Sequence, residues 1–242
     1  AYKTMGGVAP SIEIDLSDVD TDEMFASLEA SMDKLRAEQA DGAEAFTETQ
    51  DASYNYTSDY YYAQLPAAYQ KTYQQLASDF DTILSSKKNF SVTTLSGYDI
   101  FYMIPYTDLD KSMAMTYAFM YSNPQYFFVS QLAWNSDNIY LITYDGYENG
   151  AARMAAANQI DIATSQWLAE INQGRDDLEK ESIIYKKLCD SVIYNKDENG
   201  AISAGSNQTI AGALLNGRCV CNGYAMTVTD VSHLIGIDCV GI

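Results

Sequence analysis

The stretch QYFFVSQLAWNSDNIYLITY, residues 125–144, decides the fold class of this chain. Its two ends, 125–132 and 138–144, are rich in β-branched and aromatic residues, which favour extended strands. The sequence AWNSDN between them carries the short polar residues that occur in turns. We therefore predict a β-hairpin here, and it is the only strong strand signal before residue 237.

Apolar residues recur at helical spacing on both sides of this hairpin. The predicted helices cover residues 65–83, 108–123, 151–172 and 177–194. Pro124 ends the second helix because proline cannot continue a helical hydrogen-bond pattern, and Gly174 closes the third. Several helices around one hairpin indicate an α+β fold, mostly helical in its N-terminal part.

Changes in composition divide the chain into three regions. Residues 1–64 are acidic and rich in small polar residues, which predicts a tether; its single short helix carries Phe25, Leu28, Met32 and Leu35 at helical spacing. Residues 65–176 form a helical region that contains the hairpin, and residues 177–242 form the last region. The tyrosine-rich stretch 51–65 is typical either of a surface that contacts sugars or of a linker that settles onto the next domain.

The strongly acidic composition excludes polyanionic partners. Lys and Arg number 14 against 33 Asp and Glu, which gives a net charge of −19. Such a chain repels phosphate backbones and anionic lipid headgroups, so we expect no nucleic-acid partner. No apolar run is long enough to cross a bilayer, and the N-terminus shows no signal-peptide pattern, so we expect no membrane insertion.

Two acidic segments and the four cysteines are candidate metal sites by residue type, but their spacing departs from the known patterns. Residues 195–206 resemble a calcium loop but end on Ser206 instead of a bidentate glutamate, and residues 18–29 carry Glu23 where the loop requires glycine. Cys189, Cys219, Cys221 and Cys239 lack the C-x-x-C spacing of zinc sites. We predict no metal and no cofactor, with calcium binding left open.

The stretch GRCVCNGYAMTVTDVSHLIG, residues 217–236, offers a candidate nucleophile. Residues 224–235 read as a helix whose inward face carries Ala225, Val228, Val231 and Ile235, so Cys221 falls at or just before the first turn. The positive end of a helix stabilises a thiolate, and backbone N–H groups there can bind an oxyanion. His233 lies twelve residues further on, about 18 Å along the helix axis, and cannot be the base.

Two other interpretations of these cysteines stay open at this point. Both cysteines of the C-x-C pair can simply be buried core residues. Alternatively, Cys219 or Cys221 can pair with Cys189 or Cys239 in an oxidising compartment, which would mask the nucleophile.

The residues CNGYA, followed after a helix by GIDCVGI, are similar to the core motif of the transglutaminase-like superfamily. The resemblance implies that Cys221 is the nucleophile, that Gly223, Tyr224 and Ala225 complete the motif, and that residues 236–242 open the first strand of the core. Residues 177–242 would then be the N-terminal part of a papain-like, transglutaminase-like core. The likeness covers roughly residues 65–242 and is strong after residue 180.

The resemblance also implies a function. The resemblance implies a bacterial thiol enzyme that is secreted or attached to the cell surface. It would be a peptidase or a protein acyl transferase with a protein or peptide substrate. A cell-wall component is a further candidate partner. The histidine and aspartate of the family follow on later strands, so we expect both beyond Ile242 and the chain as given to be inactive. The alternative is a non-catalytic adhesion or wall-binding module that keeps only the fold.

Overall fold

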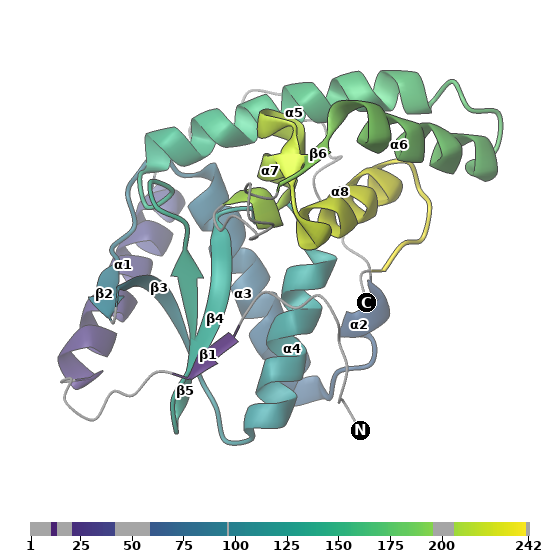
Figure 1. Cartoon of the computed structure of the whole chain (residues 1–242). Coiled ribbons are helices and arrows are strands. Elements are labelled where there is room, and N and C mark those ends of the chain that lie inside the picture. The colour runs from purple at the N-terminus through teal and green to yellow at the C-terminus, as the bar shows by residue number, and fades with distance from the viewer. Residues whose placement is uncertain (1–10, 14–20, 42–58, 96, 196–205, 241–242) are drawn as a thin grey trace.

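Five strands form a central sheet, and helices cover both of its faces (Figure 1). The computed structural model describes residues 11–13, 21–41, 59–95, 97–195 and 206–240. The sheet has the order β1-β4-β5-β3-β2, with β1 parallel to β4 and the other neighbours antiparallel. Its strands are β1 Ser11–Glu13, β2 Thr93–Leu95, β3 Tyr98–Pro105, β4 Val129–Trp134 and β5 Asn138–Thr143. The fold is α+β, as the sequence predicts.

The predicted hairpin is confirmed as β4 and β5. The two strands pair in antiparallel register with Leu132 opposite Leu141. In the turn, the Asn135 side-chain oxygen accepts hydrogen bonds from the backbone N–H groups of Asp137, at 3.1 Å, and Asn138, at 2.8 Å. This pattern explains why the short polar sequence of residues 135–138 reverses the chain.

Every residue of β5 is buried because both faces of the sheet are covered. Ile139 and Leu141 belong to the large core on one face, which also contains Phe80 of helix α3 (Ala67–Ser85) and Phe119 of helix α4 (Leu109–Ser122). Tyr140 and Ile142 belong to a smaller core on the other face. Both helices lie where the apolar stripes predict them. Asp108 caps α4 by accepting a hydrogen bond from the Lys111 N–H at 3.1 Å, and α4 ends before Pro124.

Helix α1, Thr21–Asp41, lies in the segment that the sequence describes as a tether, and it packs against the sheet. Met24 and Leu28 are buried in the smaller core, and Met32 and Leu35 in the larger one. Phe25, which the predicted stripe includes, has a side chain outside the described residues. The apolar stripe of this helix therefore contributes to the folded core. Of the tyrosine-rich stretch, residues 51–58 lie outside the description, and Asp59–Tyr62 form the short helix α2.

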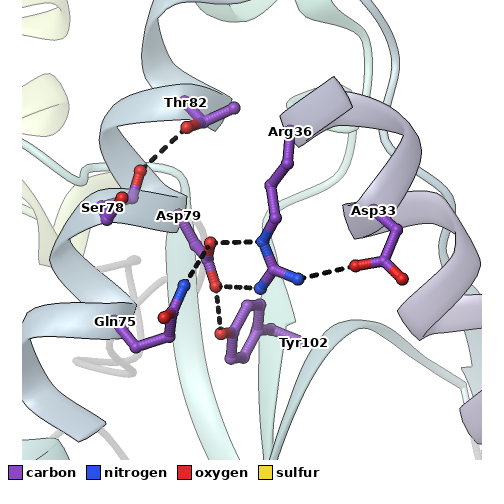
Figure 2. Close-up of polar contacts among 7 residues, drawn as sticks. All are labelled: Asp33, Arg36, Gln75, Ser78, Asp79, Thr82 and Tyr102. Carbon is purple, nitrogen blue, oxygen red and sulfur yellow. Dashed lines mark hydrogen bonds and ion pairs between the residues drawn. The ribbon is translucent and has the colours of Figure 1, made fainter. Parts of the chain in front are cut away.

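A buried polar cluster fixes α1 to α3 and β3 (Figure 2). The Asp79 side chain is only 1% exposed, and its carboxylate accepts hydrogen bonds from Arg36 Nε at 2.7 Å and Arg36 Nη2 at 2.5 Å. It also accepts from the Tyr102 hydroxyl at 2.5 Å and from Gln75 Nε2 at 3.0 Å. Burial and the neighbouring Asp79 carboxylate raise the pKa of Tyr102, so the phenol keeps its proton and donates. We call these four residues the Arg36–Asp79 cluster.

Helix α5, Gly150–Ile171, crosses one end of the sheet and is fixed there by Arg153 (Figure 1). The Arg153 guanidinium is fully buried and donates to the carbonyl oxygens of Ile83, Ser86, Lys88 and Tyr147 at 2.7–3.1 Å. Burial lowers the pKa of Arg153 to about 10. Carbonyl oxygens carry partial negative charge and so compensate the buried cation, and the charge of Glu148 acts in the same direction.

The remaining elements form a second body of packed helices beside the sheet. They are α6 Asp177–Ser191, β6 Ile193–Tyr194, the 3-10 helix η2 Ser206–Gln208, α7 Ile210–Asn216, β7 Arg218–Cys219 and α8 Cys221–Leu234. Trp167 and Ile171 at the end of α5 pack with Ile184 and Leu188 of α6 and with Val231 of α8. The helical predictions for residues 151–172 and 177–194 are thus confirmed, with the second helix ending three residues early.

Two strand predictions need correction. Strand β3 was missed, because Tyr98–Pro105 shows no clean alternation of apolar and polar residues, although Ser96 and Gly97 precede it in the sequence and Pro105 ends it. Conversely, residues 237–240 form no strand, although the resemblance implies one from residue 236 onward. Their backbone groups instead bond back to α8: the Ile237 N–H donates to the Ser232 carbonyl at 2.9 Å, and the Cys239 carbonyl accepts from His233.

Candidate thiol site at the start of helix α8

The junction between β7 and α8 separates two neighbouring cysteines. Cys219 ends β7 and is fully buried, whereas Cys221 is the first residue of α8 and is exposed. Burial, followed by the charge of a nearby Cys221 thiolate, raises the pKa of Cys219 to about 12. Cys219 therefore stays a thiol at neutral pH and packs as an apolar side chain. The sequence prediction that Cys221 lies at the first turn of a helix is confirmed.

Short contacts with the preceding 3-10 turn hold the junction in place. The Val220 N–H donates to the Asn207 carbonyl at 3.0 Å, and Asn222 Nδ2 donates to the Gln208 carbonyl at 2.8 Å. Val220 occupies the N-cap position, and its apolar side chain makes no capping bond. The N–H groups of the first helical residues have no acceptor inside a helix, so those of Cys221–Gly223 can face a negative charge near the Cys221 sulfur.

Each of the three motif residues after Cys221 has a defined environment. Gly223 lies so close to the preceding turn that an added Cβ would stand 2.5 Å from the Cys219 Cβ and 2.6 Å from the Asn207 carbonyl oxygen. The Tyr224 hydroxyl donates to the Val192 carbonyl at 2.8 Å, which ties α8 to the end of α6. Ala225 is exposed. Gly223 and Tyr224 thus set the position of the helix that carries Cys221.

The charge of the candidate nucleophile also acts on a buried phenol of α4. Tyr121, near the end of α4, is buried at 8% exposure. Burial, and to a smaller extent the charges of Tyr117, Tyr61 and Cys221, raise the pKa of Tyr121 to about 12, so it keeps its proton at neutral pH. Sequence reasoning missed this group, because nothing in the sequence relates α4 to α8.

The structure separates His233 from Cys221, as the helix length predicts. His233 is the only histidine of the sequence and lies at the opposite end of α8. It is buried, and its Nε2 atom is 2.6 Å from the Cys239 carbonyl oxygen. His233 is therefore held by the chain that follows α8 and cannot take a proton from Cys221.

The inward face of α8 is largely the predicted one. Val231 is buried, Val228 and Ile235 are half-buried and pack against the same core, and Ala225 alone of the four predicted residues is exposed. The helix also buries polar side chains, which apolar spacing does not identify. Asp230 is the extreme case: its Oδ2 atom is buried and has no hydrogen-bond partner within the described residues, and burial together with Asp161 raises its pKa to about 7.

None of the four cysteines, all of which the structure describes, forms a disulfide. In the described ranges no group of three or more His, Cys, Asp or Glu side chains is arranged to hold a metal ion. Of the first calcium-like segment, residues 196–205 lie outside those ranges; of the second, residues 18–20 lie outside them and residues 21–29 form the start of helix α1. Among the described helices, none is long and apolar enough to span a membrane.

The sequence matches no protein-family model and no curated protein. The assignment of the candidate site therefore depends on its own geometry and on the motif resemblance alone.

Proposed function

We propose that Cys221 is the nucleophile of a transglutaminase-like thiol enzyme that acts on a protein or peptide substrate. The observation that supports this proposal is the position of the thiol: Cys221 is exposed at the first turn of α8, while Cys219, two residues earlier, is buried. Backbone N–H groups of the same turn are suited to bind the oxyanion of a tetrahedral intermediate.

In the proposed reaction the Cys221 thiolate attacks the carbonyl carbon of a carboxamide or peptide. The C–S bond forms, the C–N bond breaks, and the leaving ammonia or amine takes a proton. A second amine or a water molecule then attacks the thioester, the C–S bond breaks, and the thiolate is released. Because His233 is held at the far end of α8, the proposal assigns the general base to a histidine outside residues 1–242. A secreted or surface location is part of the same proposal.

The chain contains its own control for this proposal. Cys189 is also exposed, but it lies in the last turn of α6, where helix carbonyl groups disfavour a negative charge. We would treat the reduced native protein with iodoacetamide at neutral pH and quantify each cysteine by mass spectrometry. We expect Cys221 to react about tenfold faster than Cys189, and Cys219 to react only after unfolding.

The alternative function, a non-catalytic adhesion or wall-binding module, predicts a different pattern. Equal labelling rates for Cys221 and Cys189 would mean that the start of α8 does not activate the thiol, and the enzyme proposal would be abandoned. The Cys221→Ala variant is the control that identifies the Cys221-containing peptide, and we expect the labelling of the other three cysteines to stay unchanged in it.

A further inference from the structure

A groove of about 600 Å³ opens at the end of the sheet near the start of α5. Gly97 and the start of strand β3, strand β4, the end of β5 with the loop that follows it, and the 3-10 helix η2 supply its walls. Its volume falls within the range of roughly 300–1,000 Å³ that is common for small-molecule sites. Cys221 does not line this groove, so the argument for a ligand here does not depend on the proposed thiol chemistry.

The groove is lined mainly by aromatic and uncharged polar side chains. Its tyrosines are Tyr98, Tyr144 and Tyr147, and its amides are Gln131 and Gln208. Neither amide side chain forms a hydrogen bond within the described part of the chain. Asp99 and Asp145 also line the groove, whereas no Lys, Arg or His of the described residues does. A groove of this composition offers both donors and acceptors but no site for an anion.

Tyr144 lines both this groove and a small neighbouring cavity, and its hydroxyl has a hydrogen-bonding capacity that the described residues leave unmet. The hydroxyl is buried, and it has no hydrogen-bond partner within the described residues. Burial raises the pKa of Tyr144, so the group keeps its proton at neutral pH. A buried hydroxyl without a partner is destabilising, which makes a polar ligand or bound water the expected partner.

We infer that this groove binds a neutral saccharide. Tyrosine rings stack on the apolar faces of sugar rings, while the sugar hydroxyls both donate and accept hydrogen bonds. That mixed requirement fits Gln131, Gln208 and the Tyr144 hydroxyl. An amine ligand fits less well, because an ammonium group only donates and would leave the donors of the two amides unmatched. An anion would meet two carboxylates and no cation.

Titration with neutral oligosaccharides tests this inference. We would use chitotriose, cellotriose, maltotriose and mannotriose, followed by isothermal calorimetry and ligand-observed NMR. We expect saturable binding of at least one of them that does not weaken with added salt. Gln131→Ala should weaken it about fivefold, and so should Tyr144→Phe, since each removes one hydrogen bond. Tyr144→Phe removes a hydroxyl without a protein partner, so it should not destabilise the fold.

Gln159→Ala is the matched control, because Gln159 is exposed on α5 and lies outside the groove. It should bind as the parent protein does. The inference is overturned if no oligosaccharide binds with a Kd below about 10 mM. It is also overturned if Gln131→Ala and Tyr144→Phe both bind normally. Binding of spermidine that is lost in Asp145→Asn, with no saccharide bound, would instead make the groove a cation site.

Discussion

The Arg36–Asp79 cluster allows a quantitative prediction about helix α1. In Arg36→Met the stem remains packed, but Asp79 loses two of its four hydrogen bonds, both donated by a cation. Breaking a fully buried ion pair costs roughly 3–5 kcal/mol. The Arg36 side chain is 40% exposed, so water can reach the vacated space and reduce this cost. We expect the free energy of unfolding to fall by about 2–3 kcal/mol.

Urea denaturation followed by circular dichroism measures this loss, with limited proteolysis as a second readout of whether α1 still packs. Asp33→Ala is the matched control, because it removes only the exposed partner of Arg36, at 2.8 Å, and should cost less than about 0.5 kcal/mol. In the double variant Arg36→Met/Asp79→Asn, the loss of unfolding free energy should be roughly 1–2 kcal/mol smaller than the sum of the losses in the two single variants. A loss below about 0.5 kcal/mol for Arg36→Met would refute the argument, since the cluster would then be no stronger than a surface ion pair.

Two further predictions concern α8. Gly223→Ala should lower the free energy of unfolding by about 1–3 kcal/mol, although alanine favours helices, because its Cβ would stand 2.6 Å from the Asn207 carbonyl oxygen. The control Ala225→Gly changes an exposed residue two positions further on and should lower it by only about 1 kcal/mol. A larger loss for Ala225→Gly than for Gly223→Ala in urea denaturation would contradict this prediction. Asp230 has a folded-state pKa raised to about 7, so its contribution to stability is present below pH 4 and lost as the pH rises through 7. Asp230→Asn should therefore be more stable than the parent at pH 8 and lose that advantage near pH 4 in thermal denaturation; a difference independent of pH would contradict the assignment.

The sequence was sufficient for elements whose signals are local. The hairpin was predictable because residues 125–144 contain two strands and their turn, and α4 because Asp108 and Pro124 mark its ends. Similarly, the position of Cys221 at the start of α8 follows from a helical pattern within twenty residues. In each case short-range chemistry decides the structure, so no distant contact needs to be known.

Features that depend on distant contacts were not predictable. The acidic composition of residues 1–64 suggested a tether, yet α1 packs because Arg36 meets Asp79 forty-three positions away. Apolar spacing identified Val228, Val231 and Ile235 on the inward face of α8, but it could not identify the polar side chains that this helix also buries. Likewise, α4 and α8 meet only in the fold, where Met120 and Asn222 line one small cavity. The groove is assembled from four segments that are separate in the sequence.

The thiol site and the groove are connected through the short 3-10 helix η2. A small cavity of about 30 Å³, room for about two water molecules, lies behind the groove and shares Ser130, Tyr144 and Gln208 with it. Asn222, the residue after Cys221, lines that cavity and donates to the Gln208 carbonyl at 2.8 Å. A ligand that moves Gln208 would therefore disturb the contact that positions the first turn of α8. Consequently, if both proposals hold, the turn at Gln208 is the part of the fold through which groove occupancy would alter the Cys221 thiol.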